Sequence, residues 1–249
     1  MKEKSTLHFT NINIHRDQHL DTVNDFLRRE DPDVACMKEI PKKDLLSIAA
    51  VCDMDYRFVT MGAVSSHPES VPFEVGIAIF WKKHLTLRGV AALSYRNRPQ
   101  IITFEKFPSI SYARILLHVL LEEEGRRFHV GTTHFTWTPD GSASDEQRTD
   151  IHALLGLLGD ARRGDGLLLA GDFNAPRGGE IFSMLAAEYR DNLPSDVRST
   201  IDPKLHRAAP LILAVDTIFS TPEYLVDNVK VHTGVSDHCA LTANVSRVL

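Results

Sequence analysis

Six places in the sequence put a polar or charged residue where an apolar, strand-like run stops. These residues are Asn13, Glu39, His134, the pair Asp172 and Asn174, Asp216, and the pair Asp237 and His238. A charge at the end of a buried strand is costly unless it is paired or bound to a metal ion. Six such places in one chain therefore predict that these side chains converge on a shared polar site.

Several of these places also have an ordinary structural explanation when taken alone. Asn13 and Asn174 could cap turns, and Glu39 could charge the first turn of a following helix. His134 could be a hydrogen-bonded histidine of the core. Asp216 is the exception, because a purely structural carboxylate inside the apolar run LILAVDTIF is difficult to satisfy.

The spacing of Asp172 and Asn174 in LLLAGDFNAP suggests a specific chemistry. Residues i and i+2 of a strand point to the same side, so a carboxylate would lie beside a neutral amide. Such a pair can orient a water molecule for attack and donate a hydrogen bond to the charge that develops opposite it.

The elements that must position these residues follow from the spacing of apolar side chains. Helices are expected from about residue 20 to 31, from Pro41 to about 49, across residues 151–158, and at 180–189. Strands are expected at residues 7–14, 33–37, 75–81, 85–91, 100–104, 113–121, 126–135, 167–170, 211–219, 226–231 and 239–245. This order predicts a single α/β domain over residues 1–249, in which two packed, mostly antiparallel or mixed sheets carry helices on their outer faces.

Composition excludes several classes of protein. The 249 residues are 43% hydrophobic and carry 28 basic against 33 acidic side chains, which is typical of a soluble globular protein. No apolar run is long enough to span a bilayer, and the three sparse cysteines favour reduced thiols in the cytoplasm. The net charge of −5 weakens an interaction with nucleic acid but leaves a local positive groove possible. No protein partner is evident.

Taken together, the ordered motifs resemble the endonuclease/exonuclease/phosphatase superfamily, which includes deoxyribonuclease I. The motifs that carry the resemblance are INI at 12–14, PDVACMKEI at 32–40, TTHF at 132–135, GDFN at 171–174, VDTIF at 215–219 and SDH at 236–238. The resemblance implies a four-layer α/β sandwich and hydrolysis of phosphoesters with a divalent metal ion. Oxygen ligands suit Mg²⁺, for which Mn²⁺ is a possible substitute.

The resemblance also implies roles for individual residues. Glu39 would be the principal metal ligand, with Asn13 and Asp237 adjacent to the metal or the phosphate. A metal there would neutralise phosphoryl oxygens and the leaving oxyanion.

For the reaction itself, Asp172 would position or deprotonate the attacking water, while Asn174 and His134 would donate to non-bridging oxygens. Asp216 would hold His238, which could then bind the phosphate or transfer a proton.

Substrate selection is expected from two polar segments, residues 135–148 and 198–207. The candidate contact residues are Trp137, Arg148, Arg177, Arg198 and His206. Trp137 could stack on a base or cover the edge of the core, and each cation could be merely solvated. Glu74 could supply a further carboxylate or be an exposed strand residue. His15 and His19 lack a nearby third ligand, which disfavours a metal site.

Three functions therefore remain open. The first is a nuclease or DNA-end phosphodiesterase, which Trp137 favours. The second is a phosphatase or phosphodiesterase for a small-molecule or lipid phosphoester, which the acidic net charge favours. The third is a non-catalytic binding module, although uncompensated Glu39 and Asp172 carboxylates would then repel one another.

Overall fold

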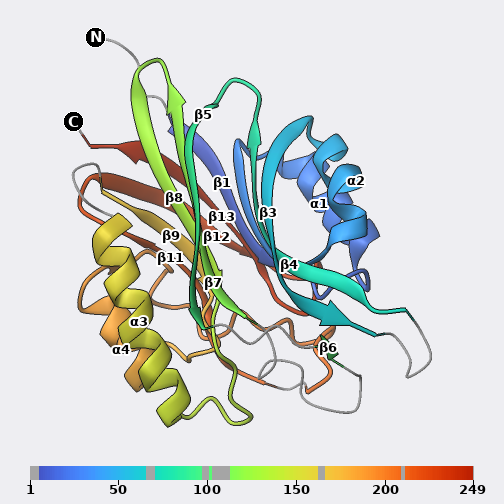
Figure 1. The fold of residues 1–249 in the computed structure, drawn as a ribbon, viewed down its shortest axis with the longest axis vertical. Coiled ribbons are helices and arrows are strands. Elements are labelled where there is room, and N and C mark those ends of the chain that lie inside the picture. The colour runs from blue at the N-terminus through green and yellow to red at the C-terminus, as the bar shows by residue number, and fades with distance from the viewer. Residues whose placement is uncertain are drawn as a thin grey trace.

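The structure is a computed structural model that describes residues 6–65, 71–96, 101–102, 113–161, 166–208 and 211–248. Within these residues the chain forms two open β-sheets that pack face to face (Figure 1). The first sheet, sheet A, is seven-stranded, and the second, sheet B, is six-stranded. Both are mixed, with most neighbouring strands antiparallel, as the sequence predicts.

Sheet A brings the first strand of the chain beside the last. Its strands, in spatial order, are β12 (Tyr224–His232), β13 (Ala240–Arg247), β1 (Thr6–Asn13), β2 (Val34–Pro41), β4 (Phe73–Lys82), β3 (Met54–Val64) and β6 (Ile101–Ile102). Strand β1 pairs antiparallel with β13 and parallel with β2. Residues far apart in the sequence therefore share the centre of this sheet.

Sheet B has one parallel pair, β8 with β9, at its centre. Its strands, in spatial order, are β10 (Arg190–Asp191), β11 (Asp216–Ser220), β9 (Leu168–Asp172), β8 (Arg126–His134), β7 (Arg114–Glu123) and β5 (Thr86–Arg96). The hairpin between β7 and β8 turns at Glu124 and Gly125, which both have positive φ. This matches the loop expected there.

Helices cover the outer face of each sheet and complete the four layers (Figure 1). On sheet A they are α1 (Leu20–Glu30) and α2 (Leu45–Val51), and α2 directly follows the short 3-10 helix η1 (Lys42–Asp44). On sheet B they are α3 (Asp145–Ala161) and α4 (Glu180–Ala186). Alternation along the strands sends residues such as Phe9 and Val130 into the layer between the sheets. The residues between them, such as Ile12 and Leu169, pack under the helices. Across the described residues, no helix combines the length and the apolar character that crossing a membrane requires.

The four-layer α/β sandwich predicted from the sequence is confirmed, but several elements differ. Strands β3 and β10 were not expected, and the helix expected at 180–189 ends at Ala186. Residues 211–215, expected to be a strand, have no regular structure, and β11 begins only at Asp216. The carbonyls of Leu213 and Ala214 instead accept hydrogen bonds from the backbone N–H groups of Thr200 and Arg177. The strand expected at 100–104 is seen only as Ile101–Ile102, since the other residues lie outside the described ones.

Candidate active site

Three neighbouring strands of sheet B carry polar residues at one common level. His134 on β8 is the register partner of Asp172 on β9, which in turn is the partner of Asp216 on β11. All three positions continue the inward-facing alternation of their strands, so their side chains enter the layer between the sheets at its end. His134 Nε2 lies 3.5 Å from Asp172 Oδ2. The ladder itself therefore assembles this half of the site.

Sheet A supplies the facing half from the ends of β1 and β2. The side-chain amide of Asn13, the last residue of β1, donates to Glu39 Oε1 at 3.1 Å and to Asp172 Oδ2 at 3.0 Å. Both of its hydrogens are thus used to connect the two sheets. Glu39 lies at a bulge between β2 and β4 and has a φ of 56°. This left-handed conformation turns its carboxylate out of the regular alternation and toward Asn13.

His238 and Asp237 reach the site from the segment before β13. His238 Nδ1 donates to Asp216 Oδ2 at 2.8 Å, and its Nε2 lies 3.7 Å from Asp172 Oδ2. The pairing of Asp216 with His238 that the family resemblance implies is therefore present in the geometry. The Asp237 side chain is 10% exposed and faces His15.

His15 and Arg16 are site residues that sequence reasoning missed. Both have positive φ, 50° and 64°. His15 Nδ1 lies 3.2 Å from Asp237 Oδ2, and Arg16 donates to His15 Nε2 at 2.9 Å. Burial lowers the pKa of His15 to about 4. The third group near this histidine comes from the far end of the chain, which the local spacing could not reveal.

Thr200 is a second missed residue, and it fixes Asp216. Its hydroxyl donates to Asp216 Oδ2 at 2.9 Å and accepts the backbone N–H of both Val215 and Asp216 at 3.0 Å. Ile201 forms a β-bridge with His238. Residues 200–201 lie within a segment that the sequence analysis assigns to substrate selection, but they support the Asp216–His238 pair.

The charges in the sheet B half reinforce one another. Burial by itself would lower the pKa of His238, but the Asp216 and Asp172 charges and the hydrogen bond to Asp216 outweigh it and raise that pKa to about 10. Burial would raise the pKa of Asp172, but His238, His134 and the hydrogen bonds from Asn13 and the Asn174 backbone lower it. The result is an imidazolium beside two carboxylates.

The sheet A half carries more negative charge than its neighbours balance. Burial raises the pKa of Asp237 to about 6, and the Glu39 and Asp172 charges add to the effect. Burial would also raise the pKa of Glu39, but His134, His15 and Arg16 lower it. Both carboxylates offer only oxygen atoms, which are the ligands that Mg²⁺ or Mn²⁺ prefers. The residues present therefore fit a divalent cation.

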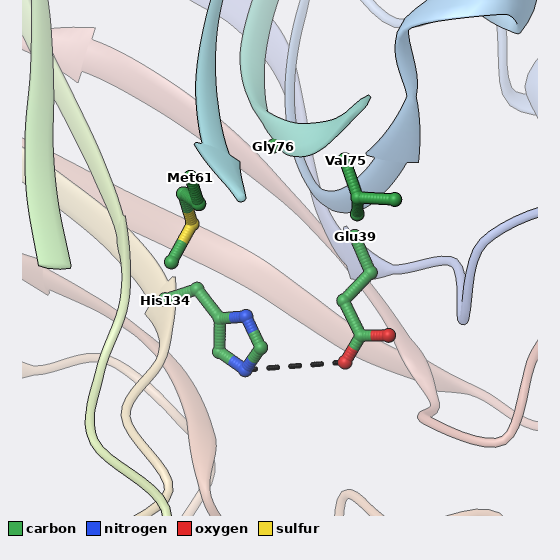
Figure 2. A pocket seen from close by; sticks show the side chains of 5 residues that line it. All are labelled: Glu39, Met61, Val75, Gly76 and His134. Atoms are coloured by element: carbon green, nitrogen blue, oxygen red, sulfur yellow. Dashed lines mark ion pairs between the residues drawn. The ribbon is translucent and has the colours of Figure 1, made fainter. Parts of the chain in front are cut away.

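A shallow recess lies beside these groups, lined by Glu39, Met61, Val75, Gly76 and His134. In Figure 2 the His134 imidazole and the Glu39 carboxylate point toward one another across the recess, and Met61 and Val75 form its apolar wall. His134 Nε2 lies 4.0 Å from Glu39 Oε1. Burial lowers the pKa of His134, so the neutral ring has one N–H to donate.

Asn174 differs from its prediction. Strand β9 ends at Asp172, and Asn174 has a φ of 48°, so the alternation assumed from the i, i+2 spacing does not extend to it. Its backbone N–H donates to Asp172 Oδ1 at 2.9 Å, while its side-chain amide donates to the carbonyl of Phe135 at 3.0 Å. Asn174 contacts Asp172 through the main chain.

Two of the cations expected to contact substrate are engaged elsewhere. Arg148 pairs with Glu180 at 2.7 Å and with Asp145 at 2.8 Å on the helical side of sheet B. Arg177 donates to the carbonyls of Leu193 and Pro194, both at 2.7 Å, and pairs with Asp191. Arg148 thus connects α3 with α4, and Arg177 holds the loop at 193–194; contact of either residue with substrate stays a prediction.

The other residues that the sequence suggested as substrate contacts lie at different distances from the site. The ring of His206 lies 6.3 Å from that of His238, at the mouth of the site. Arg198 is exposed and Trp137 is half-buried, on the loops that flank the site. Glu74 is a half-buried strand residue that pairs with Lys42, and it is not among the residues that line the recess.

The sequence as a whole matches one family model. The model describes the Endonuclease/Exonuclease/phosphatase family, and the match covers residues 10–238. The chain belongs to this family. The match begins within β1 and ends at His238, so it contains every motif on which the sequence-based resemblance rests. A comparison with curated proteins gave no match.

Solved structures of this family share the fold. An endonuclease/exonuclease/phosphatase from Bacteroides vulgatus is similar with a TM-score of 0.72 and 16% identity, over 98% of this chain and 100% of that one. The human nocturnin catalytic domain gives 0.70 and 17%, over 99% and 97%. A Bacteroides thetaiotaomicron mannosyl-6-phosphatase gives 0.67 and 13%, over 96% and 99%. At these identities the similarity establishes the architecture.

Proposed function

We propose that the protein is a divalent-metal-dependent phosphoester hydrolase that promotes in-line attack of water on phosphorus. The observation that carries this proposal is the cluster that Asn13 joins: its amide donates both to Glu39 on sheet A and to Asp172 on sheet B, and Asp172 Oδ2 lies 3.7 Å from His238 Nε2. Family membership supports the same reaction class. We also treat residues 1–249 as one domain, because both sheets share one core.

In this proposal the carboxylates of Glu39 and Asp237 hold the metal. Bound there, the ion supplies Lewis-acid neutralisation of phosphoryl and leaving-group oxygens. Asn13 orients Glu39, because both hydrogens of its amide are used on carboxylates. This differs from direct ligation by Asn13, since its Oδ1 accepts the backbone N–H of His15 at 3.0 Å.

Asp172 holds the attacking water and accepts its proton at Oδ2, the oxygen that faces His238 and Asn13. His238, kept charged by Asp216, and the N–H of His134 donate to the non-bridging oxygens. This division gives His238 the role of phosphate binding and leaves the proton to Asp172.

Among substrate classes, we favour a compact phosphoester. Arg148 pairs with residues of α3 and α4 and Arg177 with a loop, which leaves fewer free cations to follow a polynucleotide backbone, and the recess beside Glu39 is small and partly apolar. Nucleic acid is the second candidate, supported by Trp137 and the exposed Arg198 on the flanking loops.

A metal-dependent activity screen tests the proposal. The full chain is assayed with Mg²⁺ or Mn²⁺ on bis-p-nitrophenyl phosphate, sugar phosphates, inositol phosphates, sphingomyelin, RNA, single-stranded DNA and abasic duplex DNA, with EDTA as control. Salt-insensitive turnover of a small ester supports the favoured class, whereas polymer cleavage with a steep salt dependence supports the nuclease. Inertness toward all substrates, together with no binding of Mg²⁺ in calorimetry, would refute hydrolysis.

A further inference from the structure

Three successive backbone carbonyls at the point where β8 ends each accept a hydrogen bond from a side chain of a different segment. The acceptors are the carbonyls of His134, Phe135 and Thr136, and the donors, in the same order, are Arg114 of β7, Asn174 after β9 and Gln147 of α3, at 3.2, 3.0 and 2.6 Å. All three acceptor residues are buried, and a buried carbonyl without a partner is costly. These side chains therefore fix the path of the backbone directly after His134.

Gln147 differs from the other two donors because it contacts both loops of the sheet B half. Besides the carbonyl of Thr136, its side-chain amide donates to the carbonyl of Asn174 at 3.2 Å. Two carbonyl acceptors require the NH₂ end of the amide, since its oxygen cannot donate. Thr136 follows His134 by two residues, as Asn174 follows Asp172. One side chain thus connects the two segments that carry these site residues.

The position of Gln147 on its helix does not by itself call for this contact. Gln147 is the third residue of α3, and its backbone N–H donates to the Oγ of Ser144, which caps the helix, at 3.1 Å. A capping box of this kind uses the side-chain oxygen of the third residue and not its N–H groups. Gln147 is nevertheless 1% exposed, with its amide nitrogen on the two loops. The amide hydrogens therefore serve the loops and not the helix.

The side chain of Thr136 is held separately by the same helix. Its hydroxyl donates to Asp150 Oδ2, and Asp150 also accepts from Arg96 Nε at 3.0 Å. Asp150 lies three residues after Gln147, on the same face of α3. The loop after β8 is thus anchored to α3 even without Gln147. What Gln147 adds is the connection between this loop and Asn174.

That connection bears on the geometry of the site. The carbonyl of Asp172 accepts the backbone N–H of Phe135 at 2.8 Å, and Asp172 Oδ1 accepts that of Asn174 at 2.9 Å. His134 Nε2 lies 3.5 Å from Asp172 Oδ2. Without the amide, the carbonyls of Thr136 and Asn174 would lose the donor that they share, and the two loops could separate. Small displacements of reacting groups are enough to reduce the rate strongly.

We propose that Gln147 is a positioning residue, whose amide holds the loop after β8 and the turn after β9 at the spacing that places His134 against Asp172. The inference rests on the proposed function, because it takes these two side chains to act on the same phosphoester. Gln147 acts only through the two loops and does not itself contact the substrate.

Two substitutions remove the donor and keep the length of the side chain. The carboxylate of Gln147→Glu has no N–H to donate, and Gln147→Met is apolar. Leu158→Ala is the matched control, because Leu158 lies in the core about three turns further along α3 and its loss lowers stability without a contact to either loop. Well below the Tm of every variant, both Gln147 variants are expected to lose about 10–100-fold in kcat with little change in KM, and the control is expected to keep the wild-type kcat.

A second background separates positioning from a general loss of order. In a His134→Ala protein, Gln147→Glu is expected to change kcat far less than in the wild type, because the group that it positions has been removed. An equal loss in both backgrounds, or a wild-type kcat in both Gln147 variants, would overturn the inference. If neither variant folds, the amide is a requirement of the fold, and the inference is overturned as well.

NMR of the full chain tests the positioning without any substrate. The ring signal that disappears in His134→Ala identifies His134. This signal is expected to shift in both Gln147 variants and to stay in place in Leu158→Ala. A wild type that hydrolyses no ester but shows these shifts contradicts the proposed function alone, whereas an unmoved His134 signal contradicts the positioning role of Gln147.

Discussion

The two halves of the site are built in different ways. In the sheet B half, His134, Asp172 and Asp216 occupy regular strands at one register, and Asp172 is 1% exposed. In the sheet A half, Glu39 lies at a bulge, and its side chain is 21% exposed. Together with His15 and Arg16, it has a left-handed backbone.

Under the proposed function, the difference reflects the different task of each half. A proton acceptor and its supporting histidine need fixed mutual positions, which a hydrogen-bonded ladder supplies without strain. A metal site needs several oxygens that converge on one point from neighbouring elements, and alternation along a strand cannot bring adjacent residues there. Left-handed backbone conformations allow adjacent residues to converge in this way. Each costs about 1–3 kcal/mol of folding free energy, and such strained residues are concentrated at functional sites.

The strongest test of the sheet B half is Asp172→Asn. The amide keeps the shape of the side chain but cannot accept a proton from water, so kcat is expected to fall by about 10²–10⁴-fold. Metal affinity, measured by calorimetry, is expected to change little, because Asp172 is not a proposed ligand. A variant that retains wild-type turnover would remove Asp172 from its role.

Glu39→Gln makes the corresponding change in the sheet A half. Loss of the carboxylate charge is expected to weaken Mg²⁺ binding by roughly 10–100-fold, and saturating metal should restore part of the activity. Asp172→Asn is not expected to recover in this way. If added metal restores the activity of both variants equally, or of neither, the assignment of metal binding to the sheet A half and of proton acceptance to the sheet B half is wrong.

The backbone strain can be measured separately from the chemistry. Glu39→Ala and Glu39→Gly both remove the carboxylate, but only glycine adopts a φ of 56° without steric cost. Glu39→Gly is expected to be about 1 kcal/mol more stable than Glu39→Ala in denaturant unfolding. The same pair of changes at Asp53, an exposed turn residue with a φ of 51°, is the positive control, and glycine is expected to be the more stable of the two there as well. Equal stability of the two Glu39 variants would argue against strain there.

An effect on stability alone, without any effect on the chemistry, is expected far from both halves. His118 and His129 stack on sheet B with ring nitrogens 3.2 Å apart, and burial lowers the pKa of His118 to about 4. The unfolded chain therefore binds more protons between pH 6.5 and 4, and the folded chain loses stability as the pH falls through that range. His118→Gln is expected to reduce this loss and to have no pH-linked effect near pH 8. Unfolding free energies at pH 8, 6.5 and 4.5 would measure it.

The sequence predicts a site residue when the pattern of its immediate neighbours marks it, and fails when its partners are distant in the chain. Asp172 and Asp216 could be predicted because each ends an apolar run, and the pairing of their strands then places them side by side. His15 and Thr200 could not be found this way, because their partners, Asp237 and Asp216, are distant in the sequence and come into contact with them only in the folded protein. Asn174 was misplaced for a related reason: its left-handed backbone breaks the alternation that the spacing argument assumes.

The surface residues were the least predictable. Whether an arginine is solvated, pairs with a helix residue or anchors a loop depends on neighbours such as Glu180 and Pro194, which no local pattern connects with it. Lys38 belongs to the same class in the interior. In the sequence it is one polar residue before Glu39, and only the packing of the two sheets reveals that it is fully buried and donates to Asn11.

The pairing of β1 with β13 has a consequence for the life of the protein in the cell. Asn13 emerges early from the ribosome, but Asp237 and His238 precede the strand that is made after all the others. A nascent chain therefore carries Glu39 and Asp172 long before Asp237 and His238 can join them. Under the proposed function, the site would be complete only after the last strand has been made and has paired with the first.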